Sequence, residues 1–425
     1  MNMNQSKAYL PRVCDTILNR HLASSGAVLV KGCKWCGKTM TSSRAANSIL
    51  YMQDADKSRS YMDLADTQPS LLLKGDTPRL IDEWQMAPVL WDAVRFEVDQ
   101  RQAVGQFILT GSSVPKDGVT AHTGTGRISQ MLMRPMSLFE SKESDGSVSL
   151  KSLFESNLEI SSTSTLSIED LAFAICRGGW PASVSLPKEY ALDTSINYIE
   201  AIINEDISTV DGIDKNPERV RLLLRSLARN IATMATNTTI INDMQTNDLS
   251  MTPPTLDIYL NALRRIFVIE DQPAWSPAIR SRTAIRTSSK RHFVDPSIAT
   301  AVLGTNPMGI LKDFNTFGFL FESLCTRDLR IYSAAIGGNV FHYRDRYNLE
   351  ADIIVSLRDG RWAAIEVKMG QKQIEEAAKN LLKLKERINT DKMGEPSFLM
   401  VLTAGEFAYK RKDGVLIVPI GCLRD

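Results

Sequence analysis

The sequence lacks the features that mark membrane and secreted proteins. No apolar run reaches the roughly 18 residues that a membrane-spanning helix requires. The first residues are polar and no apolar stretch follows them, so they do not resemble a secretory signal. The 6 cysteines are scattered over 425 residues, which indicates a reducing compartment with free thiols. We therefore expect a cytoplasmic protein.

An excess of one charge and the spacing of a zinc site are also missing. The 4 histidines lie far apart in the sequence, so they do not predict a zinc site. The formal net charge is +1, so any surface that binds nucleic acid must be a local patch. No internal repeat or long low-complexity tract is present, and a length of 425 residues favours two or three domains.

The apolar pattern predicts an α/β protein in three parts. Residues 1–145 alternate short apolar runs with amphipathic stretches, which is typical of a largely parallel sheet with helices. Residues 146–305 have mainly helical periodicity, and residues 306–425 form a second α/β unit. A Ser-, Asp- and Gly-rich stretch at 141–152 predicts a linker or exposed loop. In the first part we expect strands at Ala27–Lys31, Ser60–Leu64, Arg79–Asp82 and Phe107–Thr110, and helices at Lys38–Ile49 and Val89–Gln102.

The segment after the first predicted strand matches the pattern G-x-x-x-x-G-K-[ST] in full. Its glycines allow successive backbone N–H groups to turn around a phosphate, and the following helix N-terminus adds positive potential. Lys38 would reach the β- and γ-phosphate oxygens, and the Thr39 hydroxyl would ligate Mg²⁺. The sequence therefore predicts an ATP–Mg²⁺ site. Its nucleotide-binding residues would be Gly32, Cys33, Lys34, Trp35, Cys36, Gly37, Lys38, Thr39 and Met40.

The predicted strand Arg79–Asp82 supplies the second half of such a site. It is apolar and ends in two acids, which is the Walker B arrangement. Asp82 would hold Mg²⁺ through its water shell, and Glu83 would polarise the attacking water. The alternative is a pair of ordinary solvated acids at the end of a strand. Next to a phosphate-binding loop, we interpret the pair as the mark of an ATP hydrolase.

Further polar residues are candidates for the same site. The predicted strand Phe107–Thr110 would place a hydroxyl, from Thr110 or Ser112, near the γ-phosphate, although either could be an ordinary strand-end cap. Arg127 and Arg134 are candidate arginine fingers provided by a neighbouring copy, and the alternative is a surface arginine. We therefore expect a ring or a smaller homo-oligomer. Cys33 and Cys36 have the C-x-x-C spacing of redox motifs, which we interpret as a coincidence in this context.

The middle region contains a pattern found in nucleic-acid-binding proteins. Two predicted helices, Thr238–Gln245 and Thr252–Ile266, are followed by a predicted strand, Phe267–Glu270, which is the order of a winged helix. The next stretch is basic and contains hydroxyl residues but no acid, as suits contacts with DNA phosphates. A helical bundle that binds protein would give a similar pattern. The candidate DNA contacts are Arg280, Arg282, Arg286, Lys290 and Arg291.

The C-terminal part has a D…E-x-K pattern, because Asp352 begins one predicted strand and Glu366–Lys368 ends the next. This pattern resembles the PD-(D/E)xK nuclease fold, in which two acids bind Mg²⁺ and a lysine positions the attacking hydroxide. Glu322, in the preceding helix, matches an additional acid of such sites, and Gln371 or Gln373 would lie near the scissile phosphate. A domain of this kind can also serve as a binding platform without cleaving. The candidate metal site comprises Glu322, Asp352, Glu366 and Lys368.

Taken in order, these motifs resemble a prokaryotic family of AAA-type ATPases whose ATPase domain is joined to a C-terminal region of unknown function. The resemblance rests on the phosphate-binding loop, on the C-terminal motifs, and on Pro11-Arg12, Leu80–Gln85, Leu109–Ser112, Gly126-Arg127 and Gly178–Pro181. The family usually has neither the cysteine pair nor Trp35 in this loop. We expect an ATPase that couples turnover to binding or remodelling of DNA, including branched or foreign DNA. The alternative is a nucleotide-dependent switch that binds a protein partner and retains a vestigial nuclease fold.

Overall fold

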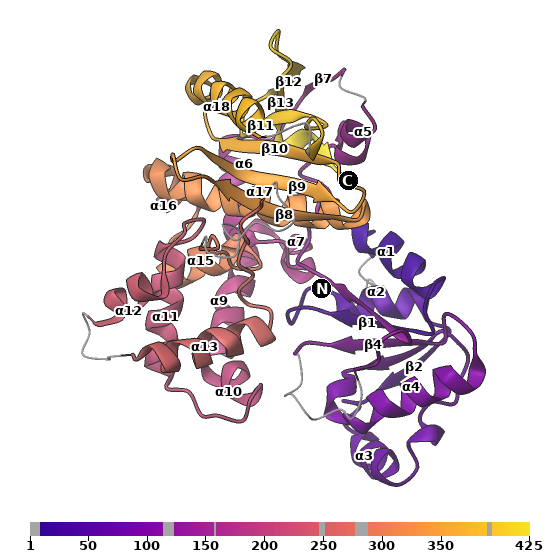
Figure 1. Ribbon diagram of the computed structural model, residues 1–425. Coiled ribbons are helices and arrows are strands. Elements are labelled where there is room, and N and C mark those ends of the chain that lie inside the picture. Colours follow the sequence, from indigo (N-terminus) through magenta and orange to yellow (C-terminus); the bar gives the residue numbers. More distant parts are fainter. Residues whose placement is uncertain (1–8, 114–122, 157–158, 246–250, 277–287, 389–392) are drawn as a thin grey trace. The chain divides into compact units, whose positions relative to one another are not determined.

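The computed structural model describes residues 9–113, 123–156, 159–245, 251–276, 288–388 and 393–425 (Figure 1). The chain forms two compact units. Unit 1 consists of Met1–Pro135 with Asn204–Lys215 and Leu260–Val268, and unit 2 consists of Met136–Ile203, Asn216–Tyr259 and Ile269–Asp425. Among the described residues, no helix has both the length and the apolar character needed to cross a bilayer.

Unit 1 is built on a parallel sheet with the strand order β2-β3-β4-β1-β5. The parallel α/β organisation predicted for this part is thus confirmed. Since β4 lies between β1 and β3, the carboxyl ends of these three strands meet at one edge of the sheet. The strands are β1 (Ala27–Lys31), β2 (Ser48–Tyr51), β3 (Arg79–Asp82), β4 (Phe107–Gly111) and β5 (Ile128–Leu132).

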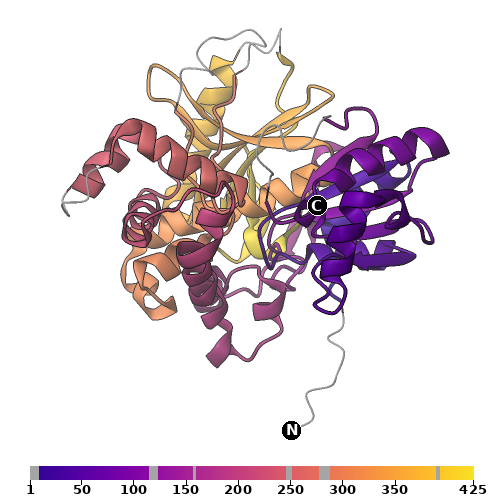
Figure 2. The ribbon, with the colours of Figure 1, turned by 90° about the horizontal axis from the view of Figure 1, so that it is seen from below.

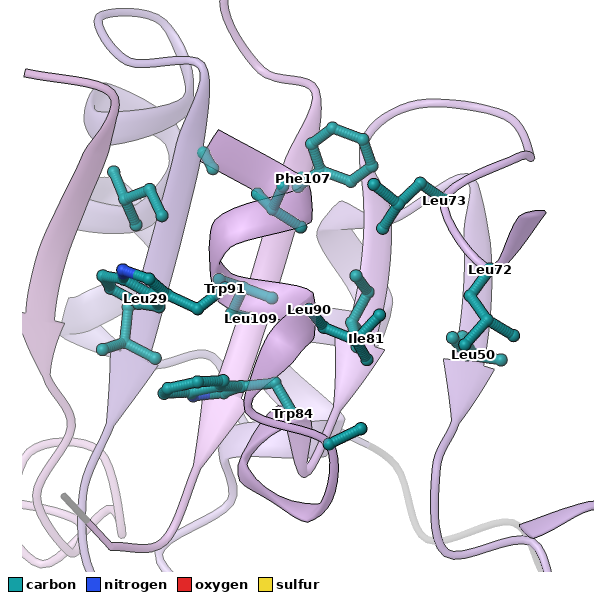
Figure 3. Packing of buried hydrophobic residues seen from close by; sticks show 14 of the residues in the cluster. Leu29, Leu50, Leu72, Leu73, Ile81, Trp84, Leu90, Trp91, Phe107 and Leu109 are labelled. Atoms are coloured by element: carbon teal, nitrogen blue, oxygen red, sulfur yellow. The ribbon is translucent and has the colours of Figure 1, made fainter. Parts of the chain in front are cut away.

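Helices cover both faces of this sheet because its central strands are apolar on both sides (Figures 1 and 2). Helices α1 (Val13–Leu22) and α2 (Lys38–Ala45) pack on one face. Helices α3 (Ser58–Thr67) and α4 (Val89–Arg101) cover the other. Figure 3 shows Leu90 and Trp91 of α4 packed against Leu29, Ile81 and Leu109 of the sheet. This core holds the three strand ends in place.

Two expectations for this unit were wrong. The predicted strand Ser60–Leu64 is part of α3, and the second strand is instead β2, which occupies the end of the helix predicted at Lys38–Ile49. A short apolar run does not by itself distinguish a strand from a helix. In α3, the helical spacing places Tyr61, Met62 and Leu64 against the same core as α4.

Unit 2 contains a seven-stranded mixed sheet with the order β7-β12-β13-β11-β10-β9-β8. Strands β8, β9 and β10 form an antiparallel meander, and β10, β11 and β13 run parallel. Helix α17 (Phe314–Ala335) packs on β8–β10, and α18 (Ile374–Arg387) packs on β9–β11. The strands are β7 (Ser161–Thr163), β8 (Gly338–Arg344), β9 (Glu350–Leu357), β10 (Trp362–Lys368), β11 (Leu399–Thr403), β12 (Phe407–Lys410) and β13 (Leu416–Pro419).

The middle region contains the two helices predicted for a winged helix, α12 (Asn237–Gln245) and α13 (Pro253–Arg265). The strand expected at Phe267–Glu270 does not form. Phe267 has a φ of 58°, and Ile269 makes only an isolated bridge to Phe293. Tyr259, on the second of these helices, is buried and so is not presented to DNA, and its hydroxyl accepts a hydrogen bond from the Asn216 N–H at 3.2 Å. The other helices of this region include α6 (Ile168–Arg177), α9 (Asp193–Ala201), α11 (Pro217–Arg229) and α15 (Pro296–Leu303).

The stretch 141–152, expected to be a linker or exposed loop, has no helix or strand at 141–147 but is folded into unit 2. Within it, β6 (Val148–Ser149) pairs in parallel with β14 (Leu423–Arg424). The buried Ser144 hydroxyl donates to the Leu423 carbonyl at 2.7 Å. The linker alternative was wrong because serine hydroxyls, which are common in loops, here bond to backbone groups of a segment far away in the sequence.

Candidate functional site

The loop between β1 and α2 has the backbone that a phosphate-binding loop needs. Gly37 caps α2 with a φ of 103°, a left-handed conformation that favours glycine. At Gly32, a Cβ atom would lie 2.1 Å from the Met133 carbonyl oxygen, so any side chain would displace the backbone. The buried Lys38 ammonium donates to the Cys33 carbonyl at 2.9 Å. The lysine therefore folds back over the loop, to the place where phosphate oxygens would bind.

Arg12 holds this loop from within unit 1. Its Nη1 donates to the Cys36 carbonyl at 2.9 Å, and its Nη2 donates to the Arg134 carbonyl at 2.8 Å. The side chain is buried, and the two bonds join the loop to the segment that follows β5. In the sequence Arg12 stands out only as part of the Pro11-Arg12 motif, which predicts no such contact. Arg134 is a candidate arginine finger, and its backbone carbonyl contacts Arg12, which also contacts the loop.

Thr39 and Asp82 lie together where Mg²⁺ would be held. The Thr39 hydroxyl donates to Asp82 Oδ1 at 2.7 Å, and Gln53 Nε2 donates to Asp82 Oδ2 at 3.3 Å. Asp82 is 0% exposed, so its charge is shielded from bulk water. Hydroxyl and carboxylate oxygens are the ligands that Mg²⁺ prefers, and this set fits the ion when nucleotide phosphates and water complete the shell. Gln53 was not anticipated, because no local pattern marks it.

Glu83, Thr110 and Ser112 meet at the carboxyl ends of β3 and β4. The Thr110 hydroxyl donates to Asp82 Oδ1 at 2.6 Å and accepts from the Glu83 N–H at 3.2 Å. The Ser112 hydroxyl donates to Glu83 Oε2 at 3.2 Å, and the Gln85 amide also hydrogen-bonds to this oxygen. Glu83 has a φ of 57°, so these bonds hold it in a left-handed conformation. Thr110 thus positions both acids, and Ser112 contacts Glu83.

Arg127 does not lie with these residues. It precedes β5, and Ile128 pairs with Ala27 at the amino end of β1, whereas the phosphate-binding loop follows the carboxyl end. Its Nε donates to Asp99 Oδ1 at 2.8 Å, and its side chain is 46% exposed. The structure therefore separates Arg127 from the phosphate-binding loop of the same chain. The other loop residues, Lys34, Trp35 and Met40, are exposed.

Cys33 and Cys36 are both fully buried, and they are not joined by a disulfide. Burial alone would raise the pKa of the Cys36 thiol, but the Cys33 side chain and the positive charges of Lys38 and Arg12 outweigh it and lower this pKa to about 6. The thiol group of Cys36 therefore lies in a positive environment created by the same residues that shape the loop.

The four residues of the candidate C-terminal site lie together in unit 2. Lys368 Nζ is 3.2 Å from Asp352 Oδ2 and 2.7 Å from Glu366 Oε2. The Val367 N–H also donates to Asp352 Oδ2, at 3.0 Å. Glu322, on α17, joins the group through a fifth residue, because Lys290 Nζ is 2.5 Å from Glu322 Oε1 and 3.2 Å from Asp352 Oδ1. We call these five residues the carboxylate–lysine cluster. Gln371 and Gln373 lie in the short exposed helix η4 (Gln371–Gln373).

The positions of Lys290 and Arg291 differ from those expected of DNA contacts. Lys290 is 6% exposed and bonded to two carboxylates. The Arg291 side chain bonds to Asp271 at 3.1 Å and to Asn237 at 2.7 Å. Both side chains are turned into unit 2, so they are not presented to a phosphate backbone. Arg280, Arg282 and Arg286 lie outside the described residues.

Burial and close charges perturb the pKa values of the carboxylate–lysine cluster. Burial raises the pKa of the Glu366 carboxyl to about 8, with the Asp352 carboxylate adding to the effect. For Asp352, burial opposes ionisation, but the ammonium groups of Lys290 and Lys368 outweigh it and lower this pKa. Burial would lower the pKa of Lys290, yet Glu322 and Asp352 raise it. Lys290 therefore stays a cation.

The two Arg12 bonds generate a testable prediction. Arg12→Lys keeps the charge but cannot donate to both the Cys36 and the Arg134 carbonyls from a planar fork. Losing one charged hydrogen bond of about 1.5 kcal/mol should weaken nucleotide binding roughly tenfold, because the loop is less well held. Titration with a fluorescent ATP analogue would measure this. Arg20→Lys, on α1, is the matched control, and an Arg12→Lys affinity equal to that of the control would contradict the prediction.

Three family models match the chain. Residues 24–142 match the model described as "AAA domain", and residues 168–309 and 317–423 match models described as "Domain of unknown function (DUF8612)" and "Domain of unknown function (DUF4143)". No curated protein matches this chain. Similar solved structures include a Walker-type ATPase of Pyrococcus abyssi, with 15% identity and a TM-score of 0.43 over 71% of this chain and 98% of that chain. A signal-transduction ATPase with numerous domains and a tetratricopeptide repeat sensor, from Pyrococcus horikoshii, has 13% identity and a TM-score of 0.28, over 76% of this chain and 48% of that chain.

The match to the AAA model covers the parallel sheet, the phosphate-binding loop and the two acids at the end of β3. Domains with these features bind a nucleotide, usually with Mg²⁺, and hydrolyse ATP. Residues 24–142 therefore form a P-loop ATPase domain of the AAA type.

Proposed function

We propose that this protein is a Mg²⁺-dependent ATP hydrolase that couples ATP turnover in unit 1 to binding or remodelling of DNA through unit 2. The observation that supports hydrolysis is the position of Glu83, which lies beside the Asp82–Thr39 pair and is oriented by Ser112. A carboxylate held there can accept a proton from water at the γ-phosphate. Mere nucleotide binding would not require it.

The residues of unit 1 divide the work of hydrolysis. Lys38 exchanges the neutral Cys33 carbonyl for the phosphate oxygens of ATP, a stronger charge-assisted bond. Thr39 and Asp82 would hold Mg²⁺, which when bound neutralises phosphate charge. Glu83 takes the proton of the attacking water. Thr110 fixes the positions of the two acids through its bonds to Asp82 and to the Glu83 backbone.

Two substitutions separate binding from chemistry. Lys38→Ala should reduce both ATP affinity and hydrolysis, since it removes a phosphate contact. Glu83→Gln should leave ATP binding within about twofold and lower kcat by about 10²-fold or more, because the amide cannot accept the proton. Phosphate release and nucleotide titration measure the two effects. Asp66→Asn, an exposed acid on α3, is the control, and hydrolysis by Glu83→Gln at the rate of this control would reject the assignment.

The DNA part of the proposal is supported by the fold of unit 2. Helix α17, the β8–β9–β10 meander and the parallel strand β11 follow the order expected for the D…E-x-K pattern, and Asp352, Glu366 and Lys368 lie together on this sheet. A second candidate is a nucleotide-dependent switch that binds a protein partner. The inward positions of Lys290 and Arg291 favour this second candidate, because they remove two of the expected phosphate contacts.

Stimulation of ATP turnover by DNA would decide between the two candidates. We expect hydrolysis to rise severalfold with one form among single-stranded, duplex and four-way-junction DNA. We also expect the stimulation to weaken steeply with salt, as binding to phosphates requires. The Lys38→Ala protein is the control for contaminating ATPases. Turnover that is the same with every DNA form at low salt would favour the protein-binding switch instead.

We also propose a homo-oligomer in which an arginine of one copy completes the ATP site of the next. Arg127 lies at the amino ends of the strands, whereas its own phosphate-binding loop lies at their carboxyl ends, and its side chain is exposed. This position suits a role in the ATP site of a neighbouring copy. Arg127→Ala and Lys38→Ala should each be nearly inactive alone. Mixing them should restore part of the activity, since some sites then combine an intact Lys38 with an intact Arg127 from its neighbour. Mixtures that stay as inactive as the separate proteins would contradict this role.

A further inference from the structure

The carboxylate–lysine cluster contains its own cation. In the nuclease fold that the D…E-x-K pattern resembles, a divalent metal would bind between the acids, and Mg²⁺ needs oxygen ligands at about 2.0–2.1 Å. Here Lys290 Nζ lies between Glu322 Oε1 and Asp352 Oδ1, at 2.5 and 3.2 Å. An ammonium at these distances occupies carboxylate oxygens of two of the three acids that would hold the metal. The residues present therefore do not fit a divalent ion.

Lys290 is fixed in this position by the backbone. Its N–H donates to the Gln272 carbonyl at 3.0 Å, and its carbonyl accepts from the Gln272 N–H at 2.9 Å. The buried Gln272 side chain in turn donates to the carbonyls of Phe341, at 2.9 Å, and Asp352, at 3.1 Å. This ties Lys290 to β8 and β9. The ammonium is thus placed by the fold and not by a freely rotating surface side chain.

The acids of the cluster also have cationic partners within the chain. Lys290 forms ion pairs with Glu322 and Asp352, and Lys368 forms ion pairs with Asp352 and Glu366. Each of the three carboxylates therefore contacts an ammonium. The Lys290 side chain is 7% exposed, so removing the carboxylates it contacts would leave a buried ammonium without compensation. Among the described residues, no group of three or more His, Cys, Asp or Glu side chains is arranged to hold a metal ion.

We propose that Lys290 replaces the divalent metal of the nuclease-like site, so that unit 2 binds no Mg²⁺ at Asp352 and does not cleave phosphodiester bonds. The ammonium neutralises the acids and stabilises the sheet, but it cannot activate water for attack on a phosphate. Unit 2 then acts by binding a partner at its surface and not by cleaving it. This inference does not depend on whether unit 2 contacts DNA or protein.

Lys290→Met provides the main test, because methionine keeps much of the length and removes the charge. Without nucleotide and in EDTA, this variant should unfold at a lower temperature, since Glu322 and Asp352 lose their shared cation. Added Mn²⁺ should restore the unfolding temperature of Lys290→Met by filling the vacated position. The restoration should disappear in Lys290→Met/Asp352→Asn. Lys312→Met, the same change at an exposed lysine of unit 2, is the matched control and should show neither effect.

The wild-type protein gives a decisive measurement even if Lys290→Met does not fold. In the absence of nucleotide, the wild type should bind as much Mn²⁺ as the variants Asp352→Asn and Glu322→Gln bind. The comparison with these variants subtracts any Mn²⁺ that unit 1 holds. The proposal would be overturned if the wild type bound Mn²⁺, or nicked plasmid in its presence, and Asp352→Asn abolished that binding or nicking. ATP hydrolysis measured in the same preparations reports on unit 1 alone, so failure of the ATPase assignment would be seen separately.

Discussion

The arrangement of unit 1 depends on one buried negative charge, the carboxylate of Asp82. A carboxylate withdrawn from water costs several kcal/mol unless hydrogen bonds or a cation compensate it. Thr39 and Thr110 both donate to its Oδ1 atom, so the charge ties the start of α2 to the ends of β3 and β4. The same Thr110 oxygen accepts from the Glu83 N–H and thereby sets the backbone of the next residue. The geometry of the ATP site is in this sense a consequence of satisfying Asp82.

Unit 2 meets the same electrostatic requirement with its own side chains. Asp352 lies between the ammonium groups of Lys290 and Lys368. A second buried group works alike, because Arg327 pairs with Asp295 at 2.8 Å and with Asp328 at 2.7 Å. Asp295 also accepts from the Gly179 N–H at 3.0 Å, so part of the Gly178–Pro181 motif has a structural role. In unit 1 hydroxyl and amide groups compensate the buried acid, whereas in unit 2 ammonium and guanidinium groups of the chain do so.

The features that could be predicted from the sequence are those whose residues act together over a short stretch. The phosphate-binding loop, β1, β3 and β4 follow from local patterns of glycine, apolar residues and strand-end acids. Arg12 and Lys290 could not be placed in this way. Arg12 bonds to a carbonyl 122 residues away, and Lys290 to a carboxylate 62 residues away. A basic stretch without acids indicates an exposed surface only when no distant carboxylates fold against it.

The pairing of β6 with β14 affects the order in which the chain can fold during synthesis. Ser144 and Leu423 are bonded across 279 residues, whereas the five strands of the P-loop sheet all lie between Ala27 and Leu132. A chain emerging from the ribosome can assemble that sheet early, because its contacts are comparatively local. The partner of β6 is synthesised only much later, so the β6 segment must wait unpaired in the meantime. The nascent polypeptide would therefore acquire its nucleotide site well before unit 2 is complete.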